Sequence, residues 1–202
     1  MTETTTDAQL LEQIRADEPG AFEAFVDRFG DKIFSFGLRM CGEREDARDV
    51  FQETMLQAYR KLKDLEHPQA LKSWLYRVAS NSCLMKRRKG KFAPNRELSL
   101  EELMPKGGNG PAVEIPDPGQ LPDDEVMQGQ MRDLLHESIG DLSAPYRIVL
   151  VMRDLQHLST REVADALELS ETAVKMRLHR ARLMVRQALE ERLLEKGRGG
   201  SR

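Results

Sequence analysis

The chain has 202 residues, of which 40% are hydrophobic and 5% aromatic, and its formal net charge at pH 7 is −3. A chain of this length is expected to form one or two domains, each with a core of its own. It contains no run approaching the roughly 18 apolar residues of a membrane-spanning helix, and its first residues are polar and acidic, unlike a secretory signal. We therefore expect a cytoplasmic protein with no membrane insertion.

The residue pattern also argues against metal binding and catalysis. Cys41 and Cys83 lie far apart and lack the close spacing of a zinc site or a redox motif. We interpret them as two reduced thiols, with a redox switch as the alternative. The chain shows no phosphate-binding loop, nucleophile elbow or metal-ligand spacing. We expect no catalytic residue, metal, cofactor, small-molecule substrate or enzymatic activity.

The N-terminal part of the chain is predicted to be helical. Long periodic runs rich in Leu, Ala, Glu, Arg and Met favour an all-α protein, and no stretch shows convincing strand alternation. Helices are expected at about 8–17, 20–40, 44–65 and 69–89. The last helix leads into a basic stretch, because residues 77–96 carry seven basic and no acidic residues. Clustered positive charge of this kind is typical of nucleic-acid binding.

A segment rich in proline and glycine follows these helices. Residues 94–122 hold six of the nine prolines, so they cannot form a helix and have little to bury. We interpret residues 92–123 as a flexible acidic linker between an N-terminal domain, 8–91, and a C-terminal domain, 124–196. The acidic residues of the linker could mimic nucleic acid, and a plain disordered tether explains its composition equally well.

The C-terminal domain is predicted to end in a helix-turn-helix motif. Its helices are expected at about 124–140, 144–156, 160–167 and 171–195. Ser159 precedes the third helix and Glu162 follows three residues later, which is the spacing of a capping box. A three-residue turn ending at Ser170, the expected cap, precedes the fourth helix. A short helix packed across a longer basic helix is the geometry that places side chains in a DNA major groove.

The fourth helix is basic on the part that would meet DNA. From 175 to 186 it carries five basic and no acidic residues. Arg suits guanine edges, both Arg and Lys suit phosphates, and backbone N–H groups at a helix N-terminus can hold a phosphate. An ordinary solvated basic face is the alternative, and His179 is expected to face DNA or solvent rather than act as a ligand or pH sensor. The residues predicted to contact duplex DNA are Ser170, Glu171, Thr172, Lys175, Met176, Arg177 and Arg180.

Three sequence blocks carry a resemblance to a known family. They are EDARDVFQETMLQAYRKL at 45–62, SWLYRVASN at 73–81 and LSAPYRIVLVMRDLQHLSTREVADALELSETAVKMRLHRAR at 142–182. The first two resemble region 2, and the third resembles region 4, of the extracytoplasmic-function (ECF) group of the sigma-70 family of bacterial RNA polymerase sigma factors. The match covers nearly the whole chain apart from the linker.

The resemblance implies an alternative sigma factor. In this family, region 2 binds core RNA polymerase and melts the −10 promoter element, and region 4 binds the −35 element as duplex DNA. The seven residues predicted above to contact duplex DNA would then read the −35 element. The resemblance also implies an anti-sigma factor as a partner, often a membrane-attached one. The sigma factor itself does no covalent chemistry, because catalysis belongs to the polymerase.

The resemblance also assigns residues in the N-terminal domain. The contacts with core polymerase are Asp49, Val50, Gln52, Glu53 and Gln57, and from the sequence alone a solvated helix face is the alternative. The −10 contacts are Lys72, Ser73, Trp74, Arg77, Asn81, Lys86, Arg87 and Arg88. Trp74 and Asn81 are two helical turns apart and share a face that would hold an unstacked base. Trp74 could equally pack in the core, and Asn81 could make a local hydrogen bond.

The chain departs from the family pattern at one position in the helix-turn-helix. Members often have glycine where this chain has Glu168, and glycine adopts a positive φ at little cost. Glu168 therefore predicts either a differently shaped turn or a small strain. The alternative function is a conventional dimeric helix-turn-helix regulator that binds operator DNA without polymerase, but it does not explain the blocks at 49–62 and 73–81.

Overall fold

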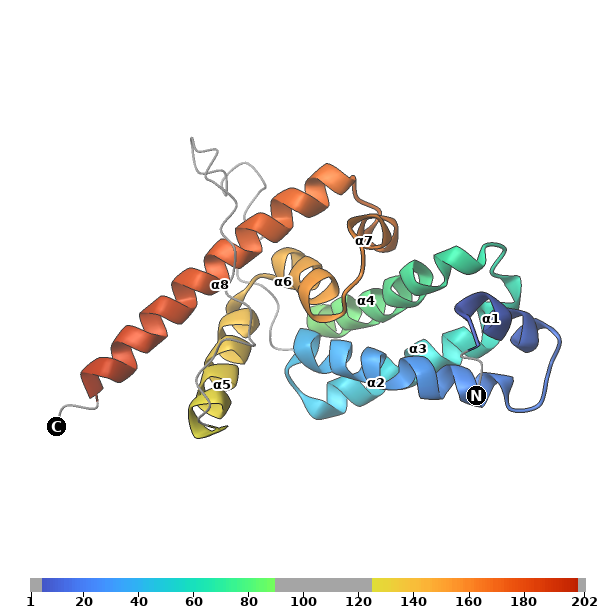
Figure 1. Ribbon diagram of the computed structural model, residues 1–202, viewed down its shortest axis with the longest axis horizontal. Coiled ribbons are helices and arrows are strands. Elements are labelled where there is room, and N and C mark those ends of the chain that lie inside the picture. Colours follow the sequence, from blue (N-terminus) through green and yellow to red (C-terminus); the bar gives the residue numbers. More distant parts are fainter. Residues whose placement is uncertain (1–4, 90–124, 200–202) are drawn as a thin grey trace.

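The computed structural model describes residues 5–89 and 125–199, so the predicted linker lies outside the described residues. Within these two ranges every regular element is a helix, as predicted for an all-α fold (Figure 1). We call α1–α4 the N-terminal bundle and α5–α8 the C-terminal bundle.

The N-terminal bundle is built around a helical hairpin. Its helices are α1 (Asp7–Arg15), α2 (Ala21–Cys41), α3 (Arg44–Lys61) and α4 (Leu71–Lys89), with 3-10 turns at Leu62–Asp64 and Pro68–Ala70. Gly20 and Gly42 flank α2 with φ angles of 82° and 84°, a backbone conformation that glycine adopts without steric cost. The helix expected at 44–65 ends as an α-helix at Lys61 and continues as a tighter 3-10 turn.

The C-terminal bundle contains one element that the hydrophobic periodicity did not predict. Its helices are α5 (Glu125–Asp141), α6 (Ala144–Leu150), α7 (Thr160–Leu167) and α8 (Glu171–Gly199). The expected helix at 144–156 is α-helical only as far as Leu150 and then widens into a π-helical segment, Val151–Leu155. The Gln156 N–H donates to the Val151 carbonyl at 2.9 Å, a bond spanning five residues instead of four.

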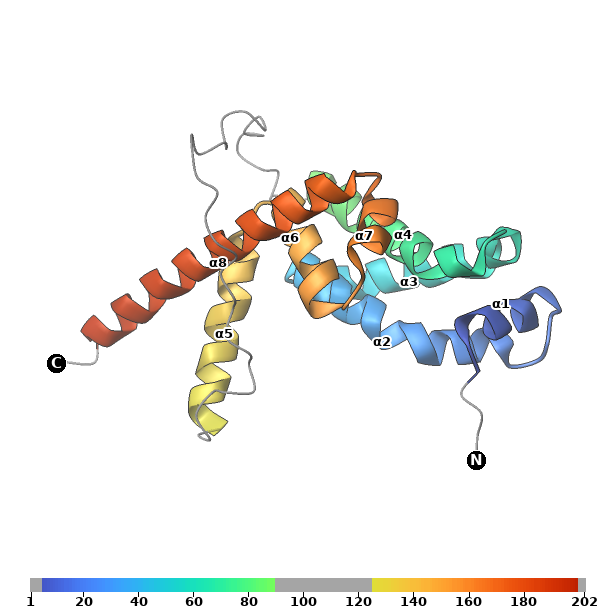
Figure 2. The same cartoon turned by 45° about the horizontal axis from the view of Figure 1, so that its top comes forward.

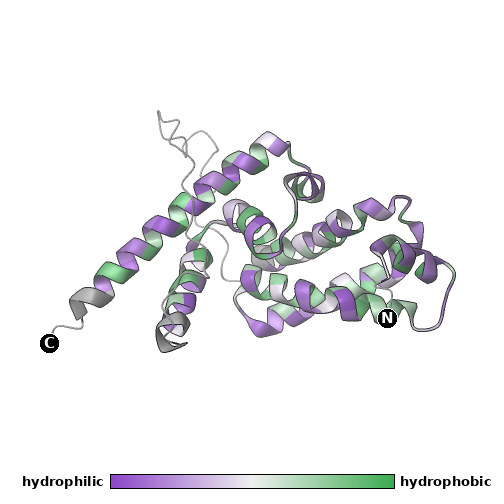
Figure 3. Ribbon diagram, in the orientation of Figure 1, coloured by the Kyte–Doolittle hydropathy of each residue, from purple (hydrophilic) through white to green (hydrophobic). Residues whose placement is uncertain are grey.

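The two bundles pack against each other through α4 and α7. Both views place α7 beside α4, and they place the N-terminus and the C-terminal end of α8 at opposite ends of the molecule (Figures 1 and 2). Helix α8 extends beyond the rest of its bundle. Hydrophilic and hydrophobic residues alternate along it (Figure 3), and its buried residues, Val174, Leu178, Ala181 and Val185, all lie in its N-terminal half.

A continuous apolar core runs through both bundles. In the N-terminal bundle the buried side chains include Phe25, Phe36 and Met40 of α2, and Leu75 of α4. In the C-terminal bundle most of α6 is buried, from Tyr146 to Leu150. Among the described residues, no helix is both long and apolar enough to cross a lipid bilayer.

Gly37 allows α2 and α3 to approach closely, and this yields a stability prediction. A Cβ at Gly37 would lie 3.3 Å from both the Cα and the carbonyl oxygen of Ala47 on α3. Replacing helical glycine by alanine usually stabilises by about 1 kcal/mol, but here the backbone of α3 would have to move. We expect Gly37→Ala to lower the free energy of unfolding by about 1 kcal/mol, as measured by urea denaturation.

The matched control is Gly129→Ala in α5, where an added Cβ meets nothing within 4 Å. This substitution should raise the free energy of unfolding by up to about 1 kcal/mol. Equal stabilisation by both substitutions would show that the close approach of α2 and α3 does not require glycine at position 37.

Candidate nucleic-acid and polymerase interfaces

The helix-turn-helix motif is held by the caps that its sequence predicts. The Ser159 hydroxyl accepts from the Glu162 N–H at 3.1 Å, and the Glu162 carboxylate accepts from the Ser159 N–H at 2.6 Å. The Ser170 hydroxyl accepts from the Ala173 N–H at 3.1 Å. These bonds satisfy N–H groups that a helix leaves without a partner at its start. The predicted capping box and the predicted cap of α8 are therefore confirmed.

The packed face of the motif determines which side of α8 faces outward. Val163, Ala164 and Ala166 of α7 are buried, as are Val174, Leu178, Ala181 and Val185 of α8. Five of the seven residues predicted to contact duplex DNA are exposed on the opposite side, and two are half-buried. The exposed residues are Ser170, Glu171, Thr172, Lys175 and Met176, and the half-buried ones are Arg177 and Arg180.

Not every basic residue of α8 belongs to this outward face. The Arg182 guanidinium donates twice to Asp154 of the π-helical segment, at 2.9 and 2.7 Å. Such two-bond pairing of arginine with a carboxylate fixes its orientation. Arg186, by contrast, is exposed, and it forms an ion pair with Glu190 within α8 at 2.7 Å. The basic stretch therefore has a structural part as well as an outward part.

Glu168 ends α7 in the left-handed conformation that glycine usually provides. Its φ and ψ are 56° and 43°, and its N–H donates to the Ala164 carbonyl. A residue with a Cβ pays about 1 kcal/mol for this conformation. The turn thus keeps the usual shape, and of the two expectations for Glu168 the structure shows the small strain.

The predicted −10 residues lie at different depths on α4. Lys72 and Asn81 are exposed, Trp74 is half-buried against the core, and Ser73 is buried with only 5% of its surface exposed. Arg77 is half-buried and is bonded to α7 of the other bundle. The helix includes Arg87 and Arg88, but their side chains lie outside the described residues.

The predicted polymerase contacts gather around a groove between α3 and α4. The groove has a volume of about 570 Å³. Asp49, Gln52 and Glu53 are exposed at its edge, and Gln57 lies next to them and donates to Glu53 at 2.8 Å. Val50 lines the groove but is fully buried, so its side chain offers no exposed surface.

Two exposed apolar side chains in this groove were not predicted. Leu56 of α3 is 43% exposed and Met85 of α4 is 54% exposed. Leu56 lies three residues after Glu53, so helical spacing alone could have placed it on the predicted face. Exposed apolar residues inside a polar rim are typical of protein–protein contact surfaces.

Lys86 lies where the two predicted surfaces of the N-terminal bundle meet. Its ammonium is 3.0 Å from Asp46 and also bonded to Asp49, and the hydrogen bond to Asp49 raises the pKa of Lys86. Lys86 lines the groove with predicted polymerase contacts although it was predicted to bind phosphates near the −10 element. A phosphate at Lys86 would have to compete with these two carboxylates.

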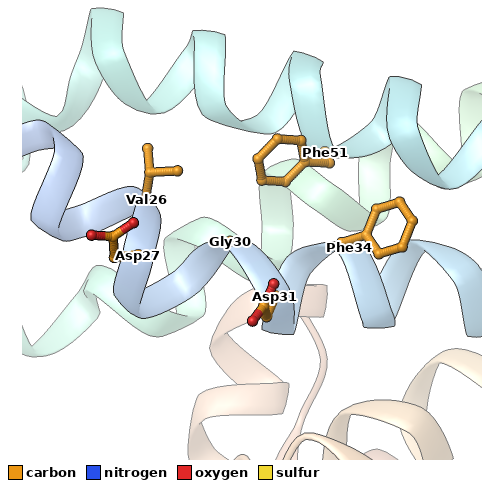
Figure 4. A pocket seen from close by; sticks show the side chains of 6 residues that line it. All are labelled: Val26, Asp27, Gly30, Asp31, Phe34 and Phe51. Atoms are coloured by element: carbon orange, nitrogen blue, oxygen red, sulfur yellow. The ribbon is translucent and has the colours of Figure 1, made fainter.

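A second hollow lies between α2 and α3, where no site residue was predicted. It has a volume of about 320 Å³, and the rings of Phe34 and Phe51 reach it from the two helices (Figure 4). Gly30 keeps it open, because an added Cβ would lie 3.3 Å from the Phe51 ring. Asp27 and Asp31 give it an acidic border.

Comparison with known proteins identifies the family. Two family models match: sigma-70 region 2 over residues 25–92 and sigma-70 region 4 over residues 132–185. The ECF RNA polymerase sigma factor SigW of Bacillus subtilis is 30% identical over 181 residues, which make up 90% of this chain and 95% of that protein. The chain belongs to the ECF sigma factors. The resemblance inferred from the three sequence blocks is confirmed, and this membership favours a sigma factor over a dimeric operator-binding regulator.

Two solved structures share the fold of this ECF sigma factor. CnrH, solved in complex with the cytosolic domain of CnrY, has a TM-score of 0.65 at 22% identity, over 92% of this chain and 97% of CnrH. The sigma factor RpoE, in complex with the anti-sigma factor NepR from Bartonella quintana, has a TM-score of 0.61 at 17% identity, over 85% and 98%.

Proposed function

We propose that this ECF sigma factor recruits core RNA polymerase through the α3–α4 groove and reads promoters with α4 and α8. The proposed domains are residues 8–91 for polymerase and −10 binding and 124–196 for −35 binding, joined by the linker 92–123. The observation that carries the proposal is that models of region 2 and region 4 both match the chain, in this order. Dividing recognition between tethered modules raises the effective concentration of the second module once the first is bound.

The groove between α3 and α4 has the composition expected of the polymerase contact. Asp49, Gln52 and Glu53 form a polar edge around the apolar Leu56 and Met85. Buried apolar anchors supply most of the binding free energy of an interface, and the polar edge supplies orientation and partner choice. We assign Leu56 and Met85 to the polymerase contact alongside the residues predicted from the sequence.

The two promoter elements are assigned to different helices. The exposed face of α8 that carries Lys175 and Met176 would enter the major groove of the −35 element, with the N-terminal turn of α8 against a phosphate. On α4, Trp74 and Asn81 would hold an unstacked base of the −10 element, with Arg77 contacting the nearby backbone. The RNA synthesis that follows is catalysed by the polymerase and not by this chain.

We further propose regulation by an anti-sigma factor in the cytoplasm, where the polymerase acts. This is supported by the similarity in fold to RpoE, which was solved in complex with the anti-sigma factor NepR. A protein that covers the α3–α4 groove or the outward face of α8 would block initiation without altering the fold.

In vitro transcription with purified core polymerase tests the function directly. We expect the full chain to direct initiation at specific start sites on a genomic DNA library, and core polymerase alone to give none of these transcripts. If the chain never produces specific starts, or if it binds the same sites equally well without polymerase, the proposed function is wrong.

A substitution on α8 tests the −35 assignment. Lys175→Ala removes an exposed cation from the outward face. We expect the mutant holoenzyme to bind promoter DNA more weakly, with a dependence of log K on log salt that is shallower by about 0.9, because one phosphate contact is lost. Fluorescence anisotropy over a series of salt concentrations measures both effects.

Arg186→Ala is the matched control, because Arg186 lies further along α8 and is paired with Glu190. It removes the same charge from the same helix. Equal losses from both substitutions would point to the total charge of α8 rather than to a contact at Lys175.

A pair of leucines tests the polymerase assignment. Leu56 and Leu183 are each 43% exposed, but Leu56 lies in the α3–α4 groove and Leu183 lies on α8. We expect Leu56→Ala to weaken binding to immobilised core polymerase about five- to tenfold, a usual effect of truncating an interface anchor. Leu183→Ala should leave the affinity unchanged, and a loss of the same size for both would rule out the groove as a localised contact.

A further inference from the structure

The contact between α4 and α7 joins a predicted DNA-reading face to the helix-turn-helix. Helix α7 lies beside α4 in both views (Figures 1 and 2). One nitrogen of the Arg77 guanidinium lies 3.1 Å from the Glu168 carboxylate, and another donates to the Asp165 carbonyl, 88 residues away in the chain. The side chain assigned to the −10 element is therefore bound by the other bundle.

Arg77 completes the C-terminal end of α7. The last carbonyls of a helix have no partner within the helix, and this end carries partial negative charge. Asp165 lies in the last turn of α7, and Arg77 supplies both the missing hydrogen-bond donor and a positive charge. A DNA phosphate offers the same chemistry, an anionic oxygen that accepts from a guanidinium. The same N–H groups of Arg77 thus cannot bind this end of α7 and a DNA phosphate at the same time.

Two further polar contacts, one partly buried and one buried, align the bundles beside this exposed pair. The Tyr76 hydroxyl donates to Gln156 at 2.8 Å, and burial raises the pKa of Tyr76 well above its usual range, so the donated hydrogen is retained. Arg147 is buried in the C-terminal bundle and donates to the Met40 carbonyl of α2 at 3.1 Å. The Arg77 and Glu168 side chains are 42% and 75% exposed, so theirs is the contact that solvent ions and other ligands reach.

The backbone of Glu168 gives an independent reason to look for a role of its side chain. The left-handed conformation is easiest for glycine, and strain of this kind is often found where a side chain has a function. At position 168 a glycine would lack the carboxylate that reaches Arg77. Glu168 is thus both the strained residue and the acidic partner in the ion pair between the bundles.

We propose that Glu168 is an autoinhibitory latch that holds α7 over the −10-reading face of α4 in the free protein. This inference rests on the proposed role of α4 in promoter reading. While the latch is closed, Arg77 is occupied by α7, and binding of single-stranded DNA to α4 requires the bundles to separate. Release exchanges the Glu168 carboxylate for a phosphate at the same guanidinium.

The test uses the full-length free protein and substitutes Glu168 rather than Arg77. Glu168→Gln keeps the size of the side chain and removes its charge. Asp165→Asn is the matched control, because it removes one negative charge from the same end of α7 and leaves the Asp165 carbonyl in place. The probes are a fluorescent single-stranded oligonucleotide of mixed sequence at low salt, followed by anisotropy, and the radius of gyration from small-angle X-ray scattering.

We expect Glu168→Gln to bind the oligonucleotide about three- to fivefold more tightly than Asp165→Asn, and to have a larger radius of gyration. The upper limit of this gain in affinity is set by the strength of an exposed ion pair, because about 1 kcal/mol corresponds to a fivefold change in Kd. The apparent affinity for the oligonucleotide is proportional to the fraction of molecules that are open, and Glu168→Gln raises that fraction. If Glu168→Gln and Asp165→Asn have the same affinity and the same radius of gyration, there is no latch.

Glu168→Gly separates the latch from a purely structural role. Glycine relieves the backbone strain, so the melting temperature should be maintained or raised, while oligonucleotide affinity and radius of gyration increase as in Glu168→Gln. With saturating core polymerase, both Glu168 variants should transcribe as the wild type does. A loss of transcription would overturn the proposal by placing Glu168 in the DNA-reading machinery. Failure of the sigma function itself is distinguishable, because it appears as absent transcription by the wild-type chain.

Discussion

The packing of α4 is the constraint on which both bundles depend. One side of this helix is anchored in the N-terminal core by Leu71, Leu75, Ala79 and Cys83, which recur every four residues and are almost completely buried. This fixes the rotation of α4 about its axis and therefore determines which elements its other sides contact. One of them borders the α3–α4 groove, and another carries Arg77 to the end of α7. The same apolar stripe therefore positions the proposed polymerase contact and the proposed −10 contact on one helix.

Local features of the fold could be predicted from the sequence because each depends on a few neighbouring residues. The capping box of Ser159 and Glu162 needs only a three-residue spacing, and the outward face of α8 follows from where its apolar residues recur. The presence of the helix-turn-helix was predictable in the same way, whereas the shape of its turn at Glu168 was settled only by the structure. Helix ends were less so, because a π-helical segment at Val151–Leu155 and a 3-10 turn after Lys61 have the same hydrophobic periodicity as a continuing α-helix over so few residues.

The contacts between the bundles could not be predicted, because they join residues that spacing does not relate. Tyr76 and Gln156 are 80 positions apart, and Arg147 and Met40 are 107 apart. Burial also divides the predicted site residues in a way that residue type does not reveal: Val50 and Ser73 lie inside, while Lys86 is held between two carboxylates. The roles assigned to these side chains remain predictions. What the three-dimensional arrangement adds is that the proposed polymerase surface and the proposed DNA surface of the N-terminal bundle are neighbours on α4, with Lys86 at their boundary.

Because of the π-helical segment, the orientation of the helix-turn-helix relative to the N-terminal bundle depends on a single residue. A π turn holds one residue more than an α turn for each closed hydrogen bond, and each residue of an α-helix turns the chain by about 100°. Deleting one residue from Val151–Leu155 would restore regular α-helical bonding after α6 but rotate everything that follows by about that angle. Gln156 would then leave Tyr76 of the other bundle, although no charge or apolar residue of α7 or α8 had changed. Chains of the same family that differ in length at this point would thus present the same recognition residues in different directions.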